Sequence, residues 1–225
     1  MQFLFLLPIR DSLYTVQLLR DQSGIGGSVM KFLCISVIGT MFWASVAFAG
    51  PLHDASKNGD VEGAKHLLDQ GVNVAEPDSA GDPPLVLAAL AGHAGIVAVL
   101  LERGANIEVR NKSGLTALHA AAYGGNLEVV KLLVAKGAAV NDNRNFYHMT
   151  PLHAAAEEGR VDVVAFLLAS KADIEAKERN GVTPLTQAGW REHWDAADLL
   201  LKAGAVCQQA GLVGEWLYTE CTKRK

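Results

Sequence analysis

The sequence predicts an all-α solenoid, a stack of similar helix-turn-helix units in which each unit contacts only its neighbours. Two markers recur at steps of 33 or 34 residues, and self-similarity at such a period is typical of repeat architectures. One marker is a leucine, and the other is a glycine that lysine replaces once. They stand at Leu52, Leu85, Leu118, Leu152 and Leu185, and at Gly71, Gly104, Gly137, Lys171 and Gly204.

The first helix of each unit is expected to begin just before the repeated leucine. Thr150 and Thr183 can cap a helix N-terminus through their hydroxyl groups. Pro151 and Pro184 would then occupy the first helical position, where the missing N–H costs nothing. Alanine runs such as 154–156 keep this helix thin, so neighbouring units can approach closely.

The second helix of each unit carries the bulky apolar side chains, as in residues 126–133. The repeated glycine fits the left-handed residue just past a helix end. Because Lys171 lacks that freedom, we expect local strain or a different turn there. Glu192 also replaces a glycine of the repeat, and Asn180-Gly181 predicts a turn between two units.

The residues around the leucine resemble the Thr-Pro-Leu-His signature of ankyrin repeats. Thr precedes the motif in three units, and the units read Pro51-Leu52-His53, Pro84-Leu85-Val86, Ala117-Leu118-His119, Pro151-Leu152-His153 and Pro184-Leu185-Thr186. The resemblance covers about residues 50–205. It implies short β-hairpin loops that project from the stack, and a structural role for His53, His119 and His153 in tying each hairpin to a helix start.

The resemblance divides this part of the chain into five repeats followed by a C-terminal cap. The expected boundaries are 50–77, 78–110, 111–143, 144–177 and 178–205 for the repeats and 206–225 for the cap.

Residues 30–49 have the pattern of a secretory signal peptide. Lys31 is followed by an apolar stretch and by Ala47-Phe48-Ala49, so cleavage is expected between Ala49 and Gly50. The alternative is an uncleaved anchor, since 32–49 is near the lower length limit for a membrane span. Residues 1–29 would precede this signal as an extension that is disordered or not translated, with translation starting at Met30.

Cys207 and Cys221 follow the last repeat, and an even cysteine count in an exported protein favours a disulfide. Two free thiols are the alternative, expected if the chain stays in a reducing compartment. A bridge would hold Trp216, Leu217 and Tyr218 over the end of the stack.

Composition argues against several functional classes. Residues 1–49 carry three cations and two carboxylates, so the remaining chain has a net charge of −5 and no basic run that would favour nucleic-acid binding. No nucleophile elbow or phosphate-binding loop is present in the sequence, and the histidines do not have metal-ligand spacing. We therefore expect no enzymatic activity, no catalytic residue, no metal and no cofactor.

A protein partner is the expected ligand, because ankyrin proteins use hairpin tips and exposed positions of the first helix to bind proteins. Aromatic residues and arginine are enriched at binding hot spots. The predicted contacts are Tyr123, Arg144, Asn145, Phe146, Tyr147, His148, Arg179, Trp190 and Arg191. Alternatively, Phe146 and Tyr147 fold back onto the neighbouring hairpin, and Trp190 fills the gap that results where Glu192 replaces glycine.

The sequence thus favours a monomeric bacterial scaffold in the periplasm, free of the membrane after signal cleavage. Two other functions remain open. One is a secreted effector that acts on a host or competitor protein. The other is a periplasmic assembly or protective factor for a stress-defence enzyme.

Overall fold

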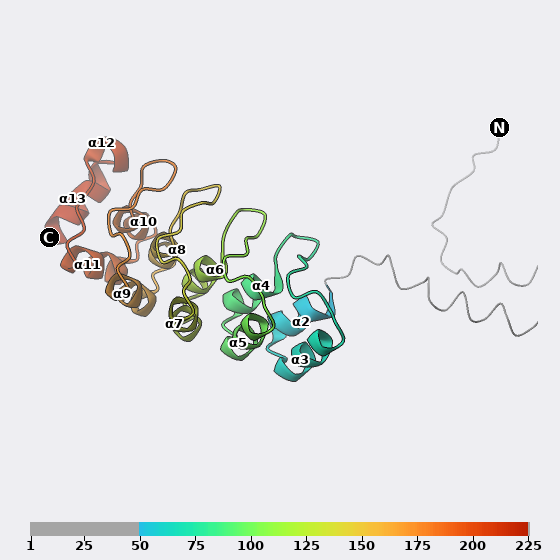
Figure 1. The fold of residues 1–225 in the computed structure, drawn as a ribbon. Helices are drawn as coiled ribbons and strands as arrows, with labels where there is room; N and C mark the ends of the chain where they lie inside the picture. The colour runs from blue at the N-terminus through green and yellow to red at the C-terminus, as the bar shows by residue number, and fades with distance from the viewer. Residues whose placement is uncertain (1–49, 225) are drawn as a thin grey trace, which may run out of the picture. The chain divides into compact units, whose positions relative to one another are not determined.

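Ten of the helices form five antiparallel pairs that lie side by side along the stack (Figure 1). The computed structural model describes residues 50–224; the expected N-terminal extension and signal peptide lie outside the described residues. The pairs are α2 (Pro51–Asn58) and α3 (Val61–Asp69), α4 (Pro84–Ala91) and α5 (Ala94–Glu102), α6 (Ala117–Gly124) and α7 (Leu127–Ala135), α8 (Pro151–Glu157) and α9 (Val161–Ala169), and α10 (Pro184–Trp190) and α11 (Trp194–Lys202).

Two layers of helices result from the different side chains that the paired helices carry. The first helix of each pair packs against the first helix of the next, and the second helices do the same. Alanines 121, 122, 155 and 156 are fully buried between the first helices. The second helices contribute larger side chains, such as Ile96, Val97 and Leu100, to the same continuous core.

The predicted helix starts are confirmed. Thr150 and Thr183 occupy the N-cap positions of α8 and α10, and Pro151 and Pro184 follow them at the first helical position. Of these two threonines, Thr150 alone uses its hydroxyl group to accept the capping hydrogen bond, from the backbone N–H of His153.

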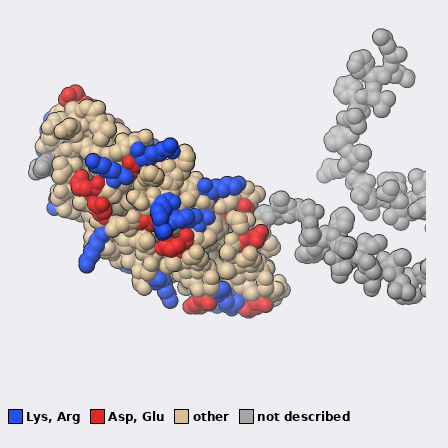
Figure 2. Space-filling model, turned by 45° about the horizontal axis from the view of Figure 1, so that its top comes forward, with Lys and Arg blue, Asp and Glu red and all other residues tan. Residues whose placement is uncertain are grey.

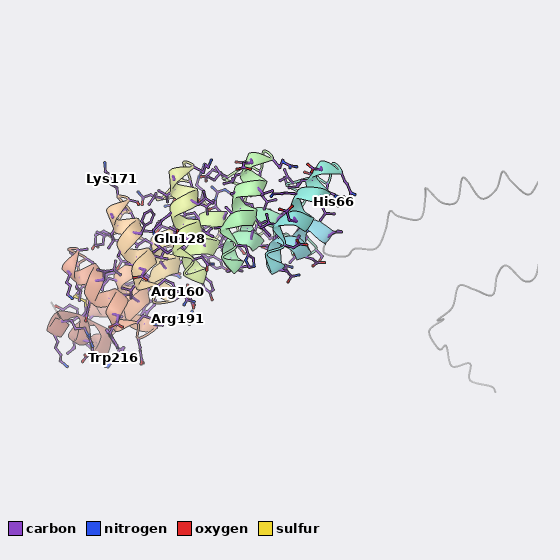
Figure 3. All side chains as sticks on the ribbon, turned by 90° about the horizontal axis from the view of Figure 1, so that it is seen from below. His66, Glu128, Arg160, Lys171, Arg191 and Trp216 are labelled. Atoms are coloured by element: carbon purple, nitrogen blue, oxygen red, sulfur yellow. A yellow bond between two sulfur atoms is a disulfide. The ribbon has the colours of Figure 1, made fainter. Side chains whose placement is uncertain are left out.

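The predicted helix ends are also confirmed. Gly104, Gly137 and Gly204 have left-handed φ values of 86°, 92° and 103°. Lys171 adopts the same region with φ 65°, so the predicted strain is present while the turn itself is kept. In Figure 3, Lys171 lies at the edge of the second-helix layer, just past α9.

Long loops rise from the stack on the side opposite the second helices (Figure 1). The predicted β-hairpins are wrong in one respect, because the described residues contain one isolated bridge, Arg110 with Thr116, and no strand. In each loop, hydrogen bonds to a polar side chain close the turn. In one of them, Asn111 Oδ1 accepts from the backbone N–H groups of Ser113 and Leu115, both at 3.0 Å. Local side-chain bonds of this kind compete with regular secondary structure.

The C-terminal cap consists of α12 (Ala210–Val213) and α13 (Glu215–Arg224), and a disulfide joins Cys207 to Cys221 across it. Leu217 is buried against α10 at Gly189, where an added Cβ atom would lie only 2.5 Å from Leu217 Cδ1. Arg224 stacks over the ring of Trp194 at 4.4 Å. The cap therefore covers the apolar surface that the last helix pair would otherwise expose.

Candidate functional site

Buried histidines hold the loops against the first helices. Nε2 of His119 donates to the carbonyl oxygens of Asp142 and Met149, and its Nδ1 accepts from the backbone N–H of Thr116. His153 repeats this arrangement between Thr150 and Val182. Burial lowers the pKa of both imidazoles below the usual value, which keeps them neutral.

The histidine role predicted from the sequence is thus confirmed, with two local variations. His53 Nε2 bonds to the Glu76 carbonyl oxygen, but its Nδ1 finds no partner among the described residues, since Gly50 stands where the last three units have threonine. In the last pair, Thr186 replaces histidine and donates to Gln208, whose side-chain amide reaches the Gly181 carbonyl oxygen. Each of these hydrogen-bonded arrangements holds a loop in place beside the first helix of a pair.

A groove of about 800 Å³ runs between the loops and the first helices. Helices α4, α6, α8 and α10 form its floor, and the loops that precede them form its wall. The lining side chains are mostly apolar, and they include Val86, Leu87, Leu90, Leu115, Tyr123, Tyr147, Met149 and Trp190. A concave, largely apolar surface with a few polar groups is the usual form of a binding site.

Four lining residues hold the same position in successive helix pairs: Leu90, Tyr123, Glu157 and Trp190. Leu90, Tyr123 and Trp190 are 45%, 45% and 47% exposed, so three of the four positions present large apolar surfaces to solvent. The pKa of Tyr123 is raised, mainly by hydrogen bonding to the Glu158 carboxylate. Glu157 forms an ion pair with Arg191 in the next pair.

The structure brings Tyr123, Tyr147, Trp190 and Arg191 of the predicted contact set together in this groove. Trp190 also donates from Nε1 to the Val213 carbonyl oxygen of the cap at 3.4 Å, so it contacts the cap while staying half exposed. In Figure 3, Arg191 lies near the cap end of the stack, and Glu128 lies on a separate outer helix.

The remaining predicted contacts lie on the loops outside the groove lining. Phe146 is 63% exposed, yet the guanidinium carbon of Arg179 from the next loop lies 4.8 Å from its ring centroid. Phe146 therefore packs on the next loop and still exposes most of its surface to solvent. His148 takes a left-handed φ of 56°, where the other loops have Gly81, Gly114 and Gly181.

Asn145 corrects the predicted contact set, because it is buried and only 6% exposed. Its Oδ1 accepts from the N–H groups of Tyr147 and Met149, and its amide donates to the Met149 carbonyl oxygen. This is the turn-closing position that Asp78, Asn111 and Glu178 occupy in the other loops. The 33- and 34-residue steps between these four polar residues are visible in the sequence, and that pattern would have identified Asn145 as structural.

An ionic cluster that the sequence analysis missed supports the same loop. Arg110 donates through both terminal nitrogens to the buried carboxylate of Asp142, at 2.8 and 2.9 Å, and Arg144 Nε adds a bond of 2.7 Å. Burial by itself would raise the pKa of Asp142, but the hydrogen bonds from the two arginines lower it to about 2. Arg144 keeps a side chain that is 69% exposed, so it remains accessible as predicted.

Charges of both signs alternate across the loop side of the stack (Figure 2). The part of the chain that the structure describes contains no cluster of three or more His, Cys, Asp or Glu side chains placed to share a metal ion. Every helix between residues 50 and 224 is too short or too polar to span a bilayer.

The family model for ankyrin repeats matches the chain in three overlapping copies, over residues 52–144, 104–178 and 140–210. These matches cover most of the chain, including every helix that contributes to the groove. The chain is an ankyrin-repeat protein. Comparison with curated proteins gave no match.

Membership of this family indicates a protein–protein interaction scaffold. Ankyrin-repeat proteins are generally non-enzymatic, and they bind partners through side chains displayed on a common framework. The shape and charge of the displayed side chains therefore determine which partner such a surface can bind.

Proposed function

We propose that this ankyrin-repeat protein is a non-enzymatic scaffold, exported from the cytoplasm, that binds one protein partner through the groove and the adjoining loop tips. The half-exposed row of Leu90, Tyr123 and Trp190 carries this proposal. Large apolar side chains left exposed together on a soluble surface mark interaction sites. Phe146 and Arg179 extend the same surface onto the loop tips.

Site-specific photocrosslinking tests this function in the native compartment. A photoreactive phenylalanine at Leu90 or Tyr123 should form one dominant crosslinked product, identified by mass spectrometry. The same group at Glu128, on the exposed face of α7, serves as the matched control. Equal crosslinking from all three positions would show that the groove has no selective partner.

Single substitutions separate binding from folding. Tyr147→Ala and Tyr123→Ala should weaken partner capture while the thermal midpoint stays nearly unchanged, because both side chains are exposed. Trp190→Phe keeps an aromatic ring but removes the donor to Val213, so it tests whether the contact with the cap matters for binding. A large stability loss in both tyrosine variants would make these residues structural.

Export is proposed from the signal pattern in residues 30–49, and the Cys207–Cys221 disulfide agrees with an oxidising compartment. We place the protein in the periplasm of a bacterium. Fractionation and N-terminal sequencing test this location: the expected product begins at Gly50 and is in the periplasmic fraction. Recovery from the culture medium would favour release, and a chain that begins upstream of Gly50 would contradict cleavage there.

A further inference from the structure

The groove presents one comparable contact from each of four successive helix pairs. Leu90, Tyr123, Glu157 and Trp190 stand at the same position of α4, α6, α8 and α10, and these helices pack in that order. Packed helices lie about 8–10 Å apart. The four side chains therefore form a row with a step of about 9 Å.

An extended polypeptide advances with a matching step. Three residues of a polyproline II segment cover about 9 Å and complete one turn, so every third side chain points in the same direction. A β-strand does not match the row, because side chains three residues apart lie on opposite faces of the strand. A polyproline II peptide laid along the row would therefore present every third side chain to the next helix pair. A helix could match the row only through every seventh residue.

Groove size favours the extended form. A helix with its side chains is about 10–12 Å wide, and over three steps of the row it would occupy roughly 2,000–3,000 Å³. The open groove holds about 800 Å³, so it suits side chains inserted from a narrow extended backbone that lies along its mouth.

Charge distinguishes the third position of the row from the other three. Leu90, Tyr123 and Trp190 are apolar contacts, whereas Glu157 is a carboxylate and Glu178 adds a second one to the facing wall. Arg191 supplies the cation of this region and is paired with Glu157, which leaves an excess of negative charge. Asp82 places another carboxylate at the far end of the groove, so an acidic segment would meet repulsion along its length.

We propose that the partner inserts an extended polyproline II segment that carries apolar side chains at its first, fourth and tenth positions and lysine or arginine at its seventh, or the same pattern in reverse. This proposal rests on the proposed function and specifies the chemistry of the partner. The apolar side chains contact Leu90, Tyr123 and Trp190, and the cation lies between Glu157 and Glu178.

A fluorescent decapeptide tests the pattern directly by fluorescence anisotropy. The probe has leucine at the first, fourth and tenth positions, lysine at the seventh, and glycine, serine and alanine elsewhere; a second probe has the reverse order. One of the two should bind. Replacing its lysine by glutamate should weaken binding about tenfold, the range expected when a charge-assisted hydrogen bond is lost. A longer probe with leucines seven residues apart should bind less well than the decapeptide.

Protein variants locate the peptide in the groove. Glu157→Gln combined with Glu178→Gln should abolish the preference for lysine over glutamate, and glutamine at position 178 keeps an oxygen to close its turn. Glu157→Lys should reverse that preference. Glu128→Gln, on the outer helix α7, removes a carboxylate away from the groove and should leave both affinities unchanged.

Three results would overturn the proposal: no binding of either decapeptide, equal affinity for the lysine and glutamate probes, or tighter binding of the seven-residue spacing. These results are distinguishable from failure of the proposed function. If photocrosslinks from Leu90 still identify one partner while the decapeptides do not bind, the groove remains the binding site and only the partner chemistry is wrong.

Discussion

Lys171 takes the same left-handed backbone conformation as Gly137, its counterpart one unit earlier, with φ of 65° against 92°. His148 and Glu192 do the same at φ 56° and 60°, where other units have glycine. All three exceptions belong to the last two helix pairs and the loop that precedes them. Each places a Cβ atom in a region that L-residues adopt at a cost of about 1–2 kcal/mol.

Replacing Lys171 by glycine should therefore stabilise the protein. We expect a gain of about 0.5–1 kcal/mol in the free energy of unfolding, because the relief of strain is partly offset by the greater freedom of glycine in the unfolded chain. Urea unfolding measures the change. Lys171→Ala is the control, since alanine keeps the Cβ atom and should leave stability nearly unchanged; an equal gain in the alanine variant would assign the effect to the side chain.

The loop at 142–149 should lose stability in acid as Asp142 becomes protonated. The folded-state pKa of about 2 lies below the ordinary value of 3.8, so this contribution is complete above about pH 4 and is lost as pH falls towards 2. A depression of this size corresponds to about 2 kcal/mol.

Asp142→Asn should lower stability by a similar amount at neutral pH and flatten the acid dependence between pH 4 and 2. Asp69→Asn provides the matched control, because the Asp69–Arg103 pair is exposed and should contribute less than about 1 kcal/mol. Similar losses in the two variants would contradict a special role for the buried carboxylate.

Mild acid should destabilise the stack through its buried histidines. The pKa values of His119 and His153 are lowered by burial, so the unfolded chain takes up protons first. Their contribution is present above the unfolded value near 6.5 and is lost as pH falls below it, by up to about 1.4 kcal/mol per pH unit for each residue. Thermal midpoints at about pH 7.5 and 5.5 measure the slope.

His66→Gln should leave this slope unchanged, because His66 is exposed on α3 (Figure 3). His119→Gln should reduce both the slope and the overall stability. A slope that persists in a variant lacking both His119 and His153 would assign the pH dependence to other groups.

Reduction of the Cys207–Cys221 disulfide should loosen the cap before the rest of the stack. Closing this loop of 14 residues corresponds to about 3 kcal/mol in the chain-entropy account. Hydrogen exchange should accelerate in α12 and α13 of a Cys207→Ser, Cys221→Ser variant and change little in α4–α7, because each unit contacts only its neighbours. Uniform acceleration along the chain would instead mean that the cap and repeats unfold as one cooperative unit.

Local rules and a single period were enough to predict the architecture. Thr150 and Pro151 start α8, and Gly137 ends the helix before it, because backbone conformation and hydrogen bonding act within a few neighbouring residues. The pairing of Cys207 with Cys221 followed from their number and position. The loop-tip contacts were predicted less well. The 34-residue step adds one residue between Gly137 and Asn145 and leaves Asn145 in the turn-closing position of the other loops.

Contacts between units depend on the spacing and register of successive helix pairs, which the sequence pattern does not predict. Asp142 meets Arg110 from 32 residues earlier, Leu217 packs on Gly189, and Tyr123 shares a groove with Trp190 only because successive helix pairs are in register. The sequence alone determined which residues form helices, turns and the repeated core, since those choices are local. Their partners across units, and the groove itself, follow from long-range packing, in which side chains far apart in the chain compete for the same space.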